Sequence, residues 1–277
     1  LASTWAINLI GVTLNGVENV TVDTDNNDST GITLSSSTVF STATTITGTG
    51  GNDGLSSNDG MNLTNVSLNT IGAIYIDADS ATANTVGATL TVGSTTFINA
   101  GAIQVIGSGD DYIQLNGNQL DLSNATLTGI AAIKGSTNND YITGSSGNDI
   151  IIGGAGSDTM LSGSGTDIFK YTATNDGGVA GDIIRDFTQG VDKLHFQASV
   201  FTGVVNTPTG STLNANDFST SSTLTSGTSF VYNTTNSTLY WDADGAGAAV
   251  GIAIAVLDND ANTGTPFTLA ATDIVMI

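Results

Sequence analysis

Four nine-residue segments follow one another without a gap: GSTNNDYIT (135–143), GSSGNDIII (144–152), GGAGSDTML (153–161) and SGSGTDIFK (162–170). Each has an aspartate at its sixth place and a large apolar residue at its eighth, and glycine recurs at the first, second and fourth places. Glycine permits the positive φ angles of tight turns. The last three places read as a short strand whose middle side chain points inward. A tandem repeat of this length predicts stacked half-turns of a parallel β-roll.

The repeated aspartates predict calcium ligands, because a carboxylate is the hard oxygen donor that calcium prefers. A single aspartate among glycines would be an ordinary turn. Four at one fixed place, each followed two residues later by an apolar side chain, favour an ion between neighbouring turns. The predicted ligand and turn residues are Asp140, Asp149, Asp158, Asp167, Gly147, Asn148, Gly156 and Gly165. The first copy is degenerate, because Asn138 stands where the fourth-place glycine is expected.

This segment resembles the repeats of the RTX family of secreted calcium-binding proteins. Residues 181–187, 190–194, 239–245 and 273–277 also resemble the C-terminal region of RTX and serralysin-type exoproteins. The resemblance implies Ca2+ as the cofactor and an extracellular location. It further implies that type I export machinery reads the acidic and apolar ending, residues 273–277.

A second periodicity precedes the nonapeptides and predicts a β-solenoid. Five apolar anchors recur at spacings of 26, 28, 29 and 30 residues, and each is followed by apolar residues three and six places later. The anchors are Leu14, Phe40, Leu68, Phe97 and Leu127. Alternating segments at 32–34, 61–63, 90–92 and 120–122 precede the anchors, and others at 20–22, 74–76 and 103–105 follow them. They predict half-buried strands, and five similar coils predict a solenoid.

Acidic or glycine-rich turns end these coils. The turn 107–111 fits the nonapeptide spacing, and residues 51–55 fit its central part, so Asp111 and Asp53 are further predicted calcium ligands. Two roles remain open for four further acids, which are either calcium ligands or solvated acidic residues of ordinary turns: Asp23, Asp25, Asp77 and Asp79. Stacked coils bring such like charges together, which destabilises the fold unless an ion lies between them.

Composition argues against several classes of function. The formal charge is −21 with only four Lys and Arg residues, which makes nucleic acid and anionic membranes poor partners. No apolar run is long enough to span a bilayer. His195 is the only histidine, so neither a zinc triad of histidines nor a relay with a second histidine can be built. We therefore predict no catalytic residues and no enzyme activity.

These patterns together predict an all-β chain: a parallel β-solenoid of about 28-residue coils (1–134), a calcium-binding β-roll (135–170), and a small C-terminal antiparallel β cap with the secretion-signal region (171–277). Short β runs are expected at 229–232, 239–241, 250–256 and 274–277. We expect Asp176 and Asp217 to lie in irregular loops and to matter less than Asp149 or Asp158. Residues 242–245 open like an EF-hand loop, but without glutamate at the twelfth place a hairpin turn is favoured.

Two functions fit this organisation. The first is a structural, calcium-dependent, self-assembling cell-surface protein, most like bacterial S-layer proteins, that folds after type I export and binds cell-surface polysaccharide through upstream regions. The alternative is the folding and secretion module of an RTX enzyme of serralysin or lipase type, or of an adhesin. The five longer coils favour the first function. The start at Leu1, without Met or a signal segment, predicts a C-terminal part of a larger protein.

Overall fold

The computed structural model describes residues 7–8, 13–14, 19–22, 31–34, 38–48, 54–57, 60–76, 87–97, 101–222, 228–243, 251–257 and 267–277. This described part is all-β with mostly parallel strands, which confirms the predicted fold class. The chain forms two compact units, Leu1–Lys134 with Ser145–Gly147, and Gly135–Gly144 with Asn148–Ile277.

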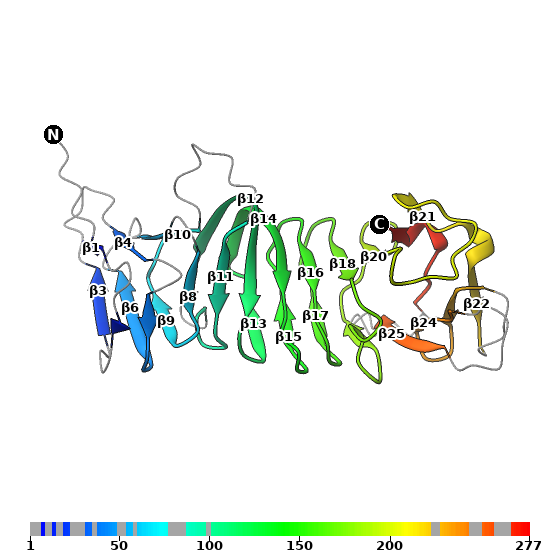
Figure 1. Ribbon diagram of the computed structural model, residues 1–277, viewed down its shortest axis with the longest axis horizontal. Coiled ribbons are helices and arrows are strands. Elements are labelled where there is room, and N and C mark those ends of the chain that lie inside the picture. Colours follow the sequence, from blue (N-terminus) through cyan, green and yellow to red (C-terminus); the bar gives the residue numbers. More distant parts are fainter. Residues whose placement is uncertain are drawn as a thin grey trace. The chain divides into compact units, whose positions relative to one another are not determined.

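In the first unit, parallel strands stack from one coil to the next (Figure 1). Their bounds are β1 Ile7–Asn8, β2 Thr13–Leu14, β3 Asn19–Val22, β4 Gly31–Thr33, β5 Val39–Phe40, β6 Thr44–Gly48, β7 Gly54–Ser56, β8 Met61–Leu63, β9 Val66–Asn69, β10 Ala73–Tyr75, β11 Thr89–Val92, β12 Ile103–Leu115, β13 Gln119–Asp121 and β14 Ala125–Lys134. One sheet has the order β1-β4-β7-β10-β12-β14, and another has the order β3-β6-β9. The alternating segments therefore form strands where the sequence predicts them.

The core of this unit is a stack of apolar side chains in register. Ile32 pairs with Leu55, Leu55 with Ile74, and Ile74 with Val105, and all four side chains are fully buried. Since side chains alternate along a strand, each coil adds inward residues to this column and sends their neighbours outward. Burial of each such side chain stabilises the fold by roughly 1.5–3 kcal/mol.

The predicted coil register is right at the start of the solenoid and wrong further on. Leu14 pairs with Phe40 as predicted. Leu68, however, pairs with Ile46 and not with Phe40, and Ile74 pairs with Val105 and not with Ile103. Apolar residues two or three places apart offer several alignments of nearly equal quality. The length of each coil determines which alignment forms, and the coil lengths vary more than the predicted spacings between anchors.

In the second unit, each nonapeptide contributes one strand, as predicted. The strands are β15 Tyr141–Thr143, β16 Ile150–Ile152, β17 Thr159–Leu161 and β18 Ile168–Tyr171. β15 pairs in parallel with β17, and β16 with β18, so successive copies alternate between two sheets as half-turns of a β-roll. The eighth-place side chains are at most 1% exposed; they are Ile142, Ile151, Met160 and Phe169.

The rest of the second unit continues both sheets of the roll. Its elements are β19 Asp182–Ile184, β20 Lys193–Phe196, β21 Ser211–Thr212, the 3-10 helix η1 Ala215–Asp217, β22 Phe218–Ser221, β23 Phe230–Asn233, β24 Thr238–Trp241, β25 Ile252–Leu257, the 3-10 helix η2 Ala271–Asp273 and β26 Ile274–Met276. β25 pairs in parallel with β19, and β26 in parallel with β20.

The predicted antiparallel cap is therefore only partly right. β23, β24 and β25 pair antiparallel, and β21 pairs antiparallel with β26, but β22 and β23 are parallel. Aromatic rings pack inside this region: Tyr171 stacks on Phe196 with centroids 5.2 Å apart, and Phe201 meets Trp241 edge-on at 5.2 Å. These contacts join the cap to the roll as one core. No helix in the described ranges is long and apolar enough to cross a membrane.

Candidate calcium centre

The four repeat aspartates lie buried at the point where each turn becomes a strand. Their exposed fractions are 4% for Asp140, 5% for Asp149, 0% for Asp158 and 1% for Asp167. The following residue opens the strand, and the apolar side chain two places on fills the core. The local sequence thus fixes each carboxyl group at an edge of the roll.

Backbone hydrogen bonds link these aspartates into two ladders, one on each edge of the roll. The Asp140 N–H donates to Asp158 Oδ1 at 2.8 Å, and the Asp149 N–H donates to Asp167 Oδ1 at 2.8 Å. In return, Thr159 N–H donates to the Asp140 carbonyl and Ile168 N–H to the Asp149 carbonyl, at 2.8 and 2.9 Å. The carboxylate oxygen Oδ1 of Asp158 or Asp167 therefore accepts a hydrogen bond from the buried backbone N–H of the aspartate two repeat copies earlier.

The second oxygen of these carboxylates is the atom that suits an ion. Oδ2 of Asp158 and of Asp167 is buried and has no hydrogen-bond partner. A buried carboxylate oxygen without a partner is costly, and a divalent cation removes that cost. Asp140 differs, because its Oδ2 accepts the Ser136 N–H at 2.5 Å and its Oδ1 accepts the Ser136 hydroxyl at 3.1 Å. The degenerate first copy is thus the least prepared for an ion.

Backbone carbonyls approach the same places. A Cβ added at Gly135 would lie 2.0 Å from the Gly153 carbonyl oxygen and 2.9 Å from Asp140 Oδ2. A Cβ at Gly144 would lie 2.5 Å from the Ser162 carbonyl oxygen and 2.8 Å from Asp149 Oδ2. Carbonyl and carboxylate oxygens converge there because glycine leaves the space. This all-oxygen donor set fits calcium, which when bound would bridge neighbouring coils.

Main-chain carbonyl oxygens of the glycine-rich turns can supply ligands beside the carboxylates. Within the described ranges, no group of three or more His, Cys, Asp or Glu side chains is placed to hold a metal. The carbonyl oxygens explain why the repeat depends on glycine as much as on aspartate.

The other predicted residues of the repeats have visible structural roles. Gly156 and Gly165 adopt φ angles of 131° and 143°, which favour glycine. Asn148 Oδ1 accepts the Thr166 N–H at 2.9 Å, and the Gly147 N–H donates to Ser145 Oγ at 3.1 Å. Whether these four residues also contact an ion stays a prediction.

Asp111 repeats the ladder geometry inside the first unit. The sequence predicted a turn at this position, but Asp111 lies within β12, at an irregularity where the pairing with β14 shifts register. Its side chain is fully buried and its Oδ1 accepts the Ala88 N–H at 2.7 Å, while the Tyr112 N–H donates to the Ala88 carbonyl at 2.9 Å. The structural part of the motif is present, and calcium at Asp111 stays a prediction. Asp53 and the acids at 23, 25, 77 and 79 lie outside the described residues.

Two aspartates that were not predicted as ligands extend the ladders. The Asp158 N–H donates to Asp182 Oδ1 at 2.9 Å, and the Asp167 N–H donates to Asp192 Oδ1 at 3.0 Å. The signal was visible as Gly177-Gly178 four and five residues before Asp182, and as Gly190 two residues before Asp192. The roll therefore has more coils than its four recognisable copies.

Asp176 lies in a segment without strands or helices, as expected for an irregular loop, whereas Asp217 lies in the 3-10 helix η1. Asp176 is 6% exposed and its Oδ2 accepts the N–H groups of Thr172 and Ala173 at 2.6 and 2.8 Å. Asp217 is 2% exposed and accepts hydrogen bonds from Asn206 and Thr207. Both carboxylates tie loops down through hydrogen bonds, so replacing either should also destabilise the protein.

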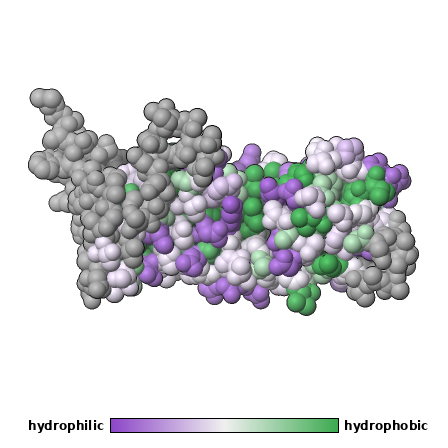
Figure 2. Space-filling model, in the orientation of Figure 1, coloured by the Kyte–Doolittle hydropathy of each residue, from purple (hydrophilic) through white to green (hydrophobic). Residues whose placement is uncertain are grey.

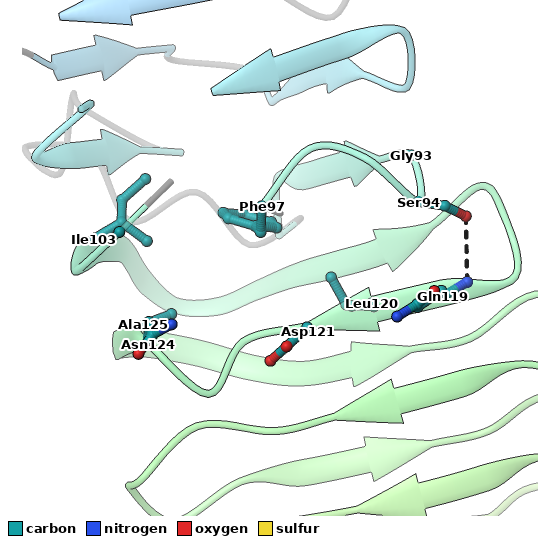
Figure 3. A pocket seen from close by; sticks show the side chains of 10 residues that line it. Gly93, Ser94, Phe97, Ile103, Gln119, Leu120, Asp121, Asn124 and Ala125 are labelled. Carbon is teal, nitrogen blue, oxygen red and sulfur yellow. Dashed lines mark hydrogen bonds between the residues drawn. The ribbon is translucent and has the colours of Figure 1, made fainter. Parts of the chain in front are cut away.

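The pocket in Figure 3 offers no reactive constellation. It lies in the first unit, measures about 280 Å³, and its lining includes Phe97, Gln119, Asp121 and Asn124. The Gln119 N–H donates to Ser94 Oγ at 3.3 Å. Outside the pocket lining, the Ser123 N–H donates to Asp121 Oδ1 at 2.9 Å. The lining includes one carboxylate and no histidine, so it contains no acid–base pair.

Burial sets the proton affinity of the ladder carboxylates. It raises the pKa of Asp158 to about 7 and that of Asp182 to about 9, and nearby carboxylates add to both shifts. A folded-state pKa above the ordinary aspartate value of 3.8 gives stability that is present at low pH and lost as pH rises through the folded value. Calcium must displace the same protons.

These shifts predict opposite pH dependence with and without calcium. In calcium-free buffer, the thermal midpoint should fall as pH rises from about 4.5 to about 8.5. In saturating calcium, the midpoint should instead fall as pH drops below about 7, because protons compete for the ligand oxygens. Thermal melts across this range check both trends. Parallel curves would show that the carboxylates do not exchange protons for an ion.

Close approach of two coils at Gly154 gives a second test. Gly154 has φ 98°, and a Cβ there would lie 2.0 Å from the Ser136 carbonyl oxygen. Gly210 has φ 82°, with nothing within 4 Å of an added Cβ. Both G154A and G210A pay the strain of positive φ, but only G154A forces coils apart. We expect G154A to lose about 2 kcal/mol more in urea unfolding with calcium, and equal losses would contradict this.

Comparison with known proteins agrees with this geometry. Residues 134–169 match the family model of the RTX calcium-binding nonapeptide repeat, in four copies. No curated protein and no solved structure matches the chain. The chain thus carries an RTX calcium-binding repeat, and calcium is the ion of its β-roll.

Proposed function

We propose that this chain is part of a structural, calcium-dependent protein that assembles on the bacterial cell surface as an S-layer and folds after export. The observation that carries the proposal is the ladder itself. Oxygens of Asp158 and Asp167 without a partner lie in the ladders between neighbouring coils, where a calcium ion would join these coils. Calcium there completes a scaffold, in contrast to an ion exposed in a reactive cleft.

The terminal segment supports folding after export. β26 pairs in parallel with β20, and its Ile274 and Met276 are at most 1% exposed. Asp273 is fully buried and accepts the Gly190 N–H at 3.0 Å and the Lys193 ammonium at 3.4 Å. Once packed in this way, residues 273–277 are inaccessible as an extended tail. We propose that type I export machinery reads them before calcium folds the chain.

Lys170 is a cation on the outward side of one sheet and supports lateral association; it lies beside His195 in the pairing of β18 with β20. Lys193 lies beside Ile168 in the same pairing, but its ammonium group already meets Asp273 Oδ1 at 3.4 Å. These side chains point away from the core, because the alternate residues Phe169 and Leu194 are fully buried. In a chain of net charge −21, such a face can meet the acidic turns of a second copy. A contact between two different surfaces propagates into an array where it does not close a ring.

The test is assembly of the whole chain as a function of calcium. Millimolar calcium should convert monomers into ordered sheets or oligomers in light scattering and electron microscopy. Magnesium should substitute poorly, because it demands smaller octahedral sites. K170E should weaken assembly while leaving calcium stoichiometry unchanged. Monomers alone at millimolar calcium would overturn the lattice proposal.

The second candidate is the folding and secretion module of an RTX enzyme or adhesin. It is favoured by the extent of the second unit, because this one compact unit includes most of the roll and the whole C-terminal region. Sequence upstream of Leu1 discriminates the two: further solenoid coils support the lattice protein, and a zinc-protease or esterase signature supports the module.

A further inference from the structure

A long segment of the second unit carries almost no charge. Between Lys193 and Asp242, Asp217 is the only Asp, Glu, Lys or Arg residue, although the chain has 25 acidic residues. Asp217 is 2% exposed, and its carboxylate accepts hydrogen bonds from Asn206 and Thr207. Pale and green residues predominate over the C-terminal region in the view of Figure 2. The one charge of the segment is therefore buried, and its outer surface is neutral.

This neutral segment includes an edge strand without the usual protection. Within the described ranges β22 is the last strand of its sheet and pairs only with β23. It has four residues, as many as the interior strands β23 and β24, and its sequence FSTS contains neither a charge nor a proline. Proteins commonly protect a sheet edge by shortening the strand or by placing Lys or Pro on it. β22 shows none of these devices.

The neighbouring sheet shows the contrast, because its edge strand at this end of the chain is protected. β21 has only two residues, and Pro208 lies three residues before it. The difference between the two edges indicates that β22 is kept available for pairing.

An exposed apolar side chain lies near the start of β22. Val205 is 83% exposed. The N–H of the next residue, Asn206, donates to Asp217 Oδ2 at 3.0 Å, and Asp217 immediately precedes β22. The buried carboxylate thus holds the loop with Val205 beside the unprotected edge.

We propose that β22 pairs antiparallel with β22 of a second copy of this chain, so that the sheet continues from one copy into the other. Copies with a net charge of −21 repel one another wherever acidic turns meet, and this neutral end avoids that repulsion. A strand that pairs antiparallel with itself has twofold symmetry, so both copies use the same backbone groups. Val205 adds apolar area next to the paired strands.

This contact rests on the proposed function and completes its geometry. The contact of Lys170 with acidic turns joins two different surfaces, so by itself it extends copies in a row. A two-dimensional layer needs another contact that links the rows. Pairing through β22 joins two identical surfaces and supplies that link.

The test uses Thr220, which is exposed within β22. In the full chain at millimolar calcium, K170E separates the β22 contact from the Lys170 contact, and analytical ultracentrifugation should show dimers. Adding T220D or T220K should raise the dimer Kd by about tenfold or more, because the twofold axis brings like charges together. An equal mixture of the T220D and T220K chains should dimerise again, because opposite charges then face one another.

The matched control is Thr212, which is exposed on the protected strand β21. T212D and T212K should leave the dimer unchanged. Monomers of the K170E chain, dimers that the Thr220 variants do not weaken, or a mixture that stays monomeric would each overturn the β22 contact. Arrays of the unchanged protein that persist in T220D and T220K would refute this contact alone. Dimers of the unchanged protein without arrays would refute the lattice alone.

Discussion

Above the raised pKa of Asp158, about 7, removing calcium is expected to abolish the folded β-roll. Buried carboxylates of successive coils repel one another, and the free oxygens of Asp158 and Asp167 have no other partner. A site with Kd of about 10⁻⁴ M contributes roughly 1.4 kcal/mol at about 1 mM free calcium. About five such sites rival the roughly 5–15 kcal/mol by which a typical domain is stable. The far-UV spectrum and the thermal midpoint, measured with and without calcium, check this expectation.

The control is magnesium at equal ionic strength, because general screening of charge would act with either ion. We expect magnesium to restore little of the β signal. A spectrum and midpoint that do not change on calcium removal would show that the roll folds on packing alone. The same titration gives the free calcium at which folding occurs, which must exceed cytosolic levels if folding is to wait for export.

The second large effect is expected for D158A. The substitution removes the acceptor of the buried Asp140 N–H, which costs about 1–3 kcal/mol, and it removes an ion ligand. Asp217 serves as the matched control, because its carboxylate is also buried and holds Asn206 and Thr207 without any place in a ladder. D158A should lower both the thermal midpoint and the dependence of that midpoint on the logarithm of calcium concentration. D217A should lower the midpoint equally at every calcium concentration.

Plots of midpoint against calcium concentration separate the two mechanisms. Parallel lines for D158A and the unchanged protein would mean that Asp158 stabilises the roll through its hydrogen bond alone. A reduced slope for D217A would place an ion in the C-terminal region, where the hydrogen bonds indicate none is needed. Each plot yields the number of ions coupled to folding, which direct titration checks independently.

Local periodicity was sufficient to predict much of the fold. Strand β17 and the burial of Met160 follow from three places of one nonapeptide, because neighbours along the chain decide which side chain points inward. The runs that became β23, β24 and β26 were visible for the same reason. The solenoid register was predicted only at its start, since Leu68 could align with Phe40 or with Ile46 on pattern alone.

The candidate calcium site, like the fold, was predicted from the sequence only in part. The sequence alone determined that the chain carries a calcium-binding roll and which aspartates recur in it. Within the four copies, ladder partners are 18 residues apart, a constant period that can be read directly. Only the tertiary structure decided that Asp182 and Asp192 belong to the same ladders, because the inserted residues change that separation to 24 and 25. It also decided which carboxylate oxygens remain for an ion, since this depends on the amide groups that stacking brings within hydrogen-bond distance.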